Sequence, residues 1–222
     1  RMRLRTADPL LAGIRDQTGL LRQIFDRKYL RFGTSGVRAR WEEDFTESRA
    51  RQVLQAICDF MNARNVPAFV GAEDLSGKIV VLGHDTRRNS DLVTKWAAET
   101  CLANGFQVHM ATRDVPTPAL AFYETEVLPA NEVAGRIIAT ASHNPPEFNG
   151  FKLGFGRDTL FGKGIQEVRE IAETGDFENG SGTVTEKDPL PDYAGDIAGR
   201  IQLGPKGVFC IVDAGNGSAG PV

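Results

Sequence analysis

Residues 135–153 read GRIIATASHNPPEFNGFKL. The first five residues form a short, mainly apolar run with two β-branched isoleucines, which is typical of a buried strand. Pro145 and Pro146 then stiffen a turn, because each proline locks φ and lacks an N–H donor. From Phe151 the chain is apolar again, which predicts a second strand that returns antiparallel to the first. The segment therefore predicts two strands joined by a stiff turn that carries Ser142.

Helical and strand patterns alternate along the rest of the chain. Apolar spacing predicts helices at about 46–61, 90–103, 118–127, 165–172 and 193–201, and strands at 78–83, 106–111 and 207–212. The polar stretch 174–190 is expected to be a loop. This alternation predicts a three-layer α/β/α domain with a mostly parallel mixed sheet. The turns that follow the strands, among them 84–88, 113–117 and the Ser142 turn, should gather at one edge of the sheet, where such folds bind ligands.

Three parts are expected along the chain. Asp8-Pro9 has the pattern of a helix start, and apolar residues at helical spacing follow it, so residues 1–28 are predicted to form a helical extension. Residues 29–200 are expected to form the α/β domain. The predicted strand 207–212 and the Gly-rich segment after it are expected to be the beginning of a second, similar domain, truncated within residues 205–222.

The composition is typical of a globular protein. Of the 222 residues, 41% are hydrophobic and 25% are charged. A net charge of −3 gives no reason to expect nucleic acid or an acidic membrane as a partner, and no apolar run approaches the ~20 residues of a membrane-spanning helix. The three cysteines are far apart and are expected to be reduced, which is typical of a cytoplasmic protein.

Ser142 and His143 place a hydroxyl beside an imidazole. A serine can pass a group covalently when a base activates it or when the group is already attached. A histidine can move a proton near neutral pH. Serine, asparagine and proline are also common turn residues, so the local chemistry alone leaves an ordinary strand-ending loop open as an interpretation.

Four segments, in order, resemble motifs of the α-D-phosphohexomutases, the phosphoglucomutase and phosphomannomutase superfamily. TASHNPPEFNGFKL at 140–153 resembles the active-site serine signature of that family. FGTSGVR at 32–38, GHDTR at 83–87 and PTPAL at 116–120 resemble three further motifs, and VFCIVDAGNG at 208–217 resembles the opening of the family's second domain. Because family members have four domains, the resemblance implies that this chain is an N-terminal fragment. Its partners would include the missing C-terminal domains, and the fragment alone would be inactive.

The resemblance implies phosphoryl transfer on hexose phosphates. Ser142 would carry a phosphoryl group and pass it to a hexose phosphate substrate, and hexose 1,6-bisphosphate would be both intermediate and activator. His143 is expected to hydrogen-bond phosphate or to move a proton. Lys152 and Arg38 would face the phosphoserine as cations. Mg²⁺ would bind Ser142 through its phosphate, with its other ligands on a second-domain loop that this chain lacks.

Phosphate contacts are expected beside the serine. Thr34, Ser35 and Gly36 would offer backbone N–H groups to a phosphate. Asn144 belongs to the same expected set, and its side chain is also expected to fold back onto the turn backbone. In the GHDTR segment, Asp85 and Arg87 are expected to form an ion pair that braces the edge of the site.

Three other interpretations stay open. Glycines between 215 and 220 fit the Gly-x-Gly-x-x-Gly pattern of nucleotide-binding oxidoreductases, but the sequence contains neither the following helix nor the acidic residue that the pattern needs. A serine hydrolase would need the flanking glycines of a Gly-x-Ser-x-Gly elbow, which Ser142 lacks. A non-catalytic regulatory or interaction module would keep the same domain, although the presence of Ser142, Lys152 and Arg38 favours a catalytic parent.

Overall fold

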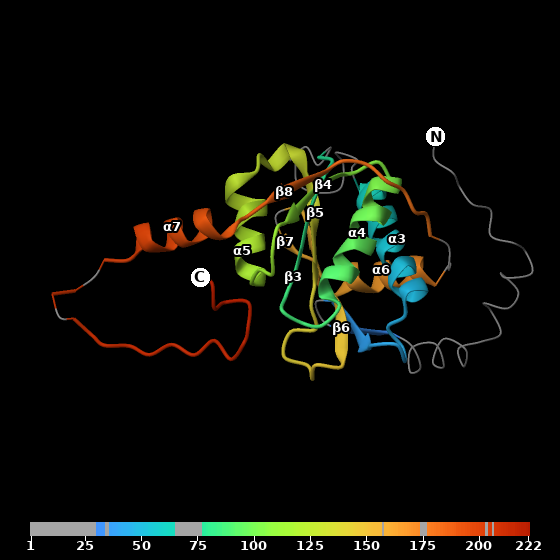
Figure 1. The fold of residues 1–222 in the computed structure, drawn as a ribbon. Coiled ribbons are helices and arrows are strands. Elements are labelled where there is room, and N and C mark those ends of the chain that lie inside the picture. Colours follow the sequence, from blue (N-terminus) through green and yellow to red (C-terminus); the bar gives the residue numbers. More distant parts are fainter. Residues whose placement is uncertain are drawn as a thin grey trace, which may run out of the picture.

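The computed structural model describes residues 30–33, 36–64, 77–156, 158–173, 177–202, 204–205 and 207–222. The predicted helical extension 1–28 lies outside the described residues, as do two of the predicted phosphate contacts, Thr34 and Ser35. The strands of the described part form one mixed sheet with helices on both of its faces (Figure 1).

The sheet has eight strands within the described residues, in the order β1-β2-β6-β5-β3-β4-β8, with β7 paired to β6. Their bounds are β1 Arg31–Gly33, β2 Gly36–Arg40, β3 Ile79–His84, β4 Gln107–Ala111, β5 Val133–Ala139, β6 Phe148–Phe155, β7 Asp158–Thr159 and β8 Val184–Lys187. β5, β3, β4 and β8 run parallel to one another. The pairings β1–β2, β2–β6, β6–β5 and β6–β7 are antiparallel. The expected mixed α/β sheet is confirmed, and the expected antiparallel return after the serine turn is β6.

Helices form a layer on each face of the sheet (Figure 1). One layer holds α3 (Glu47–Arg64), α4 (Ser90–Ala103) and α6 (Lys163–Ala172), and the other holds α5 (Thr117–Phe122), its π-helical continuation η1 (Tyr123–Val127) and the start of α7 (Leu190–Arg200). A short 3₁₀ turn, η2 (Ala130–Glu132), leads into β5. In β3, Val80 and Leu82 pack in the core with α3 and α4, whereas Val81 packs in the core with α5, because successive strand residues face opposite sides. No helix in the described part of the chain is long and apolar enough to cross a membrane.

Two segments differ from the sequence-based expectation. Residues 184–187, inside the expected loop 174–190, form β8 at the edge of the sheet beside β4. Its side chains are mostly exposed, so the segment lacks the apolar run that marks a buried strand.

Residues 207–212, expected to be a strand, pair with no strand among the described residues. Their apolar side chains are exposed, and Phe209 is 90% accessible. An apolar segment becomes a strand only when a neighbour satisfies its backbone groups, and the described residues supply none here.

Candidate active site

The serine turn leaves β5 in a backbone conformation that few residues adopt. Ser142 has a φ of 56°, in the left-handed region that residues with a side chain rarely occupy. Ser142 N donates to Thr140 Oγ1 at 2.9 Å, and Asn144 N donates to Ala141 O at 3.1 Å. A strained residue persists only where its surroundings fix it, and such residues cluster at functional sites.

The Arg87 guanidinium lies inside the turn and fixes its shape. Its Nη2 donates to the carbonyl oxygens of Ser142 and Asn144, both at 2.6 Å. Its Nη1 donates to the carbonyl oxygens of Pro145 at 2.8 Å and Phe148 at 3.2 Å. One planar cation thus gathers four backbone carbonyls, which the point charge of a lysine would not do. Sequence reasoning assigned Arg87 only to a bracing ion pair and missed this larger role.

Asp85 in turn fixes Arg87. Its Oδ2 accepts from Arg87 Nε at 3.2 Å, which confirms the expected ion pair, and from Thr140 Oγ1 at 2.6 Å. Its Oδ1 accepts from Ser90 Oγ and from Arg87 N, both at 3.0 Å. Because both oxygens are engaged by the protein, Asp85 braces the turn and is not available as a metal ligand. The described residues hold no group of three or more His, Cys, Asp or Glu side chains placed to bind a metal ion.

Arg38 is the predicted site residue that contacts the serine hydroxyl. Its Nη2 donates to Ser142 Oγ at 3.1 Å. The pairing of β2 with β6 places it there, with Arg38 opposite Gly150. A Cβ at position 150 would lie 2.0 Å from Val37 O, so this close approach of the two strands requires glycine. Arg38 Nε is buried and has no hydrogen-bond partner among the described residues.

Lys152 lies on β6 on the same face of the sheet as Arg38, because it is two residues beyond Gly150. Its side chain is half-buried. Burial first, and then the charges of Arg38 and Arg136, lower the pKa of Lys152, whereas the charge of Asp85 acts in the opposite direction. Gly36 begins β2 beside this strand, and a Cβ there would lie 2.3 Å from Phe151 O. Lys152 and Arg38 are thus neighbouring cations on one face of the sheet, and Arg38 is the one that contacts the serine.

His143 and Asn144 complete the predicted set. The His143 side chain is exposed on the turn, next to Ser142. The expectation that the Asn144 side chain folds back onto the turn is wrong, since it forms no hydrogen bond with the described residues. Asn144 instead contacts the turn through its backbone, which donates to Ala141 O and accepts from Arg87. The physical reason is that Arg87 already fills the inside of the turn and satisfies its carbonyls.

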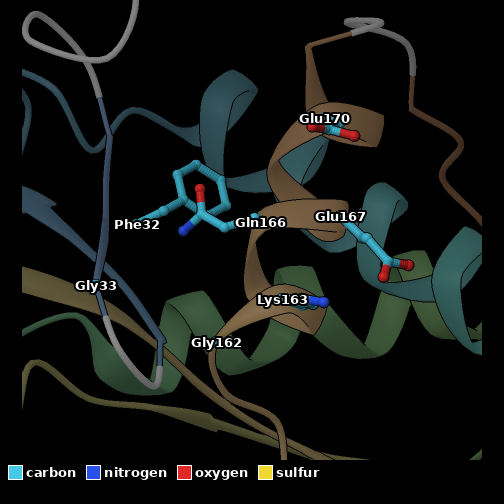
Figure 2. Close-up of a pocket in the computed structure, with 7 residues that line it drawn as sticks. All are labelled: Phe32, Gly33, Gly162, Lys163, Gln166, Glu167 and Glu170. Carbon is cyan, nitrogen blue, oxygen red and sulfur yellow. The ribbon is translucent and has the colours of Figure 1, made fainter.

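An open groove of about 800 Å³ lies between β1 and α6 (Figure 2). Phe32 and Gly33 line one side of it. Gly162, just before α6, and four residues of α6 line the other side: Lys163, Gln166, Glu167 and Glu170. The described lining includes none of the predicted site residues. The candidate active site is therefore the serine turn with Arg38 and Lys152, and not this groove.

Comparisons with known proteins agree with the fold. Residues 30–179 match the family model described as phosphoglucomutase/phosphomannomutase, alpha/beta/alpha domain I. A phosphomannomutase/phosphoglucomutase of Pseudomonas aeruginosa strain PAO1 is 36% identical over 179 residues, which cover 78% of this chain and 37% of that protein. A phosphoglucomutase of Neisseria meningitidis serogroup B is 36% identical over 144 residues, which cover 64% of this chain and 30% of that protein.

A solved structure shows the same likeness. The crystal structure of a phosphoglucomutase/phosphomannomutase family protein from Burkholderia thailandensis superposes with a TM-score of 0.64 at 27% identity, over 78% of this chain and 36% of that one. The chain spans about a third of the length of these relatives. The mixed sheet, the serine turn and the match over residues 30–179 lead to one conclusion: the chain belongs to the phosphoglucomutase/phosphomannomutase family.

Proposed function

We propose that this chain is the serine-bearing part of a phosphohexomutase and that Ser142 carries the phosphoryl group which the enzyme transfers. The observation that carries the proposal is the contact of Arg38 Nη2 with Ser142 Oγ at 3.1 Å, on a turn held by Arg87. A guanidinium beside this oxygen stabilises the negative charge of a phosphoryl group attached to it. The names of the relatives, phosphoglucomutase and phosphomannomutase, support a hexose phosphate as the substrate.

The proposed reaction consists of two similar transfers. A hydroxyl of the hexose phosphate attacks the phosphorus on Ser142, the new O–P bond forms, and the bond from phosphorus to Ser142 Oγ breaks. The proton of the attacking hydroxyl passes to Ser142 Oγ, so the step is balanced. The hexose 1,6-bisphosphate then turns round and returns its other phosphoryl group to Ser142 by the reverse step. Added hexose 1,6-bisphosphate would phosphorylate an unmodified serine and so would activate the enzyme.

The neighbouring residues have separate tasks in this proposal. Arg38 uses Nη2 for the serine oxygen, and its Nη1 would donate to a phosphoryl oxygen. Lys152 supplies the second cation. His143, exposed beside the serine, would hydrogen-bond the phosphate or move a proton at the substrate hydroxyl. Thr34, Ser35, Gly36 and Asn144 remain proposed contacts of the substrate phosphate.

A metal ion would need ligands that the described residues do not provide. Mg²⁺ prefers six oxygen ligands, and the oxygens of Asp85 are already bound by Arg87, Thr140 and Ser90. In the proposed enzyme, this chain would contribute only a phosphoryl oxygen on Ser142 to Mg²⁺. When bound there, the ion would supply positive charge that offsets the negative charge of the phosphoryl group.

The proposal is tested on the whole gene product that contains these 222 residues. With hexose 1,6-bisphosphate present, we expect it to convert glucose 1-phosphate or mannose 1-phosphate to the 6-phosphate. Ser142→Ala should abolish the conversion, whereas Ser48→Ala, a matched change at an exposed serine of α3, should leave it intact. Full activity of the Ser142→Ala protein would reject the proposal.

A second assay concerns the 222 residues alone. We expect negligible turnover, because the chain spans about a third of its relatives' length. A folded gene product without any turnover would instead favour the non-catalytic interpretation.

A further inference from the structure

A buried ion pair lies next to Lys152. Glu124, on η1, has no exposed surface, and Arg136, on β5, is 4% exposed. The Arg136 guanidinium donates to the Glu124 carboxylate, and its Nη2 also donates to Thr159 Oγ1 at 3.3 Å. The second carboxylate oxygen, Glu124 Oε1, has no hydrogen-bond partner among the described residues.

The pair is costly for the fold. Removing two charges from water is expensive, and apolar residues of similar size are often at least as stable in such a position. The unpaired Glu124 Oε1 adds to that cost. The pair also restricts the residue opposite it on β6. A Cβ at Gly154 would lie 2.9 Å from Arg136 Cζ and 3.1 Å from Glu124 Oε1, so the position favours glycine. Glu124 lies in a π-helical turn, a rare distortion that is frequent at functional sites. These costs converge on one place and indicate a role other than stability.

Lys152 is the neighbour on which the pair acts. Lys152 and Gly154 share a face of β6, and Arg136 pairs with Gly154 while Ile138 pairs with Lys152. Arg136 is therefore a diagonal cross-strand neighbour of Lys152, within reach of long side chains.

The charges around Lys152 come from several elements. They are Arg136 from β5, Arg38 from β2 and Asp85 after β3. Glu124, on η1, acts through its ion pair with Arg136. The helix α5 has no charged residue. Arg38 already contacts Ser142 and Asp85 already binds Arg87. Arg136 is thus the charge next to Lys152 whose place depends on Glu124.

We propose that Glu124 and Arg136 are positioning residues for Lys152, in which Glu124 anchors the Arg136 guanidinium beside the Lys152 ammonium and the fixed positive charge eases release of the lysine proton. Burial and the two arginines shift the pKa of Lys152 in this direction. A lysine that releases its proton more easily can take up the proton of the attacking hydroxyl, and it then carries the positive charge that faces the phosphoryl group. The inference rests on the proposed function for the use of Lys152, but the effect on its charge belongs to the domain itself.

The test measures the titration of Lys152 directly. The 222-residue chain, without any sugar phosphate, is labelled with a trace of an amine-reactive reagent at values from about pH 7 to pH 11, and peptide mass spectrometry gives the pH of half-maximal labelling. Lys95, exposed on α4, serves as the internal reference. Glu124→Gln keeps a side-chain oxygen that can accept from Arg136, so the guanidinium stays beside Lys152, but it removes the negative charge that offsets it and should lower the midpoint of Lys152 by about half a pH unit or more. Arg136→Gln removes a positive charge and should raise it by a similar amount, and the double variant should lie between the two.

Opposite shifts in the two single variants support the inference, because a general structural defect would move both midpoints in the same direction. Unchanged midpoints, or two shifts of one sign, overturn it. If Glu124→Gln does not fold, as judged by circular dichroism, then Arg136→Gln is compared with Arg136→Lys, which keeps the charge. A midpoint that rises in Arg136→Gln but not in Arg136→Lys supports the inference. Any other result overturns it. Since no substrate is present, this outcome is independent of whether Ser142 accepts a phosphoryl group.

Discussion

Arg87 Nη2 donates to the backbone carbonyl of Ser142 at 2.6 Å across 55 positions of sequence. The same guanidinium binds three further carbonyls of the serine turn and the carboxylate of Asp85. The loop that presents the hydroxyl therefore owes its shape to a residue on the turn after β3. Parallel pairing of β3 with β5 brings the two turns together.

Arg87→Ala should destabilise the protein and loosen the serine turn. The change leaves four carbonyls and Asp85 without their partner, and we expect the free energy of unfolding to fall by about 2–3 kcal/mol, since water can reach part of the turn. Urea denaturation measures the loss, and limited proteolysis at 142–148 measures the loosening. Arg88→Ala, at the exposed neighbouring arginine, is the matched control and should change little. Equal losses in the two variants would contradict the bracing role of Arg87.

Arg38→Lys should slow phosphoryl transfer while the protein stays folded. The lysine keeps the charge but loses the guanidinium geometry that reaches Ser142 Oγ, so we expect a rate about 10–100-fold lower. Arg40→Lys is the control, because the exposed Arg40 side chain pairs with Glu43 and Glu147 and lies over the ring of Phe148, away from the serine hydroxyl. Stopped-flow or quench measurements on the whole gene product give the rates. If the Arg38→Lys protein transferred the phosphoryl group at the parent rate, the guanidinium of Arg38 would have no role in the transfer.

Gly150→Ala should disturb the pairing of β2 with β6. The added Cβ would lie 2.0 Å from Val37 O and 3.0 Å from the Cα of Arg38, so the strands must separate. We expect a loss of about 1–3 kcal/mol or more in unfolding free energy, together with lower phosphoryl transfer. Gly199→Ala in α7, where a Cβ meets nothing within 4 Å, should be neutral or slightly stabilising. If the two variants are equally stable, the close approach of β2 and β6 is not what the site requires.

His109 should make part of the stability depend on pH. Burial first, and then the charge of Lys187, lower the pKa of His109 from its ordinary value of 6.5, while Glu132 opposes the shift. Between the lowered pKa and about pH 6.5 the unfolded chain binds the proton more readily than the folded protein, so stability rises with pH through this window. His109→Gln should flatten this rise in urea denaturation followed across the window.

Tyr123→Phe provides the control for this prediction. It removes the hydroxyl that lies 3.0 Å from His109 Nδ1 but keeps the histidine, so the slope should remain because burial is the main cause of the shift. If the unfolding free energy of the His109→Gln protein rose with pH as steeply as that of the parent, groups other than His109 would cause the pH dependence.

The fold was predictable where patterns are local. The apolar runs that became β3, β4 and β5 and the helices at about 46–61 and 90–103 follow from the periodicity of their own residues. β8 was not predictable in this way, because an edge strand takes its backbone partners from β4 and needs no apolar face. The exposed stretch 207–212 shows the converse, since apolar residues alone do not make a strand.

The site was predictable only in part, for a similar reason. Ser142 and its stiff turn are visible in the sequence, but the four carbonyls that gather around Arg87 depend on the packing of two distant turns. One signal in the sequence was available for the ion pair of Arg136. An arginine in an apolar strand must find a carboxylate, although nothing local identifies that partner as Glu124.

The central claim is that Ser142 Oγ accepts a phosphoryl group. It is tested most directly by the intact mass of the whole gene product after incubation with hexose 1,6-bisphosphate, followed by mapping of the modified residue. We predict a gain of about 80 Da, the mass of one phosphoryl group, located on Ser142 and lost in Ser142→Ala. A gain of the same size that persists in Ser142→Ala, or that maps to another residue, would contradict the account.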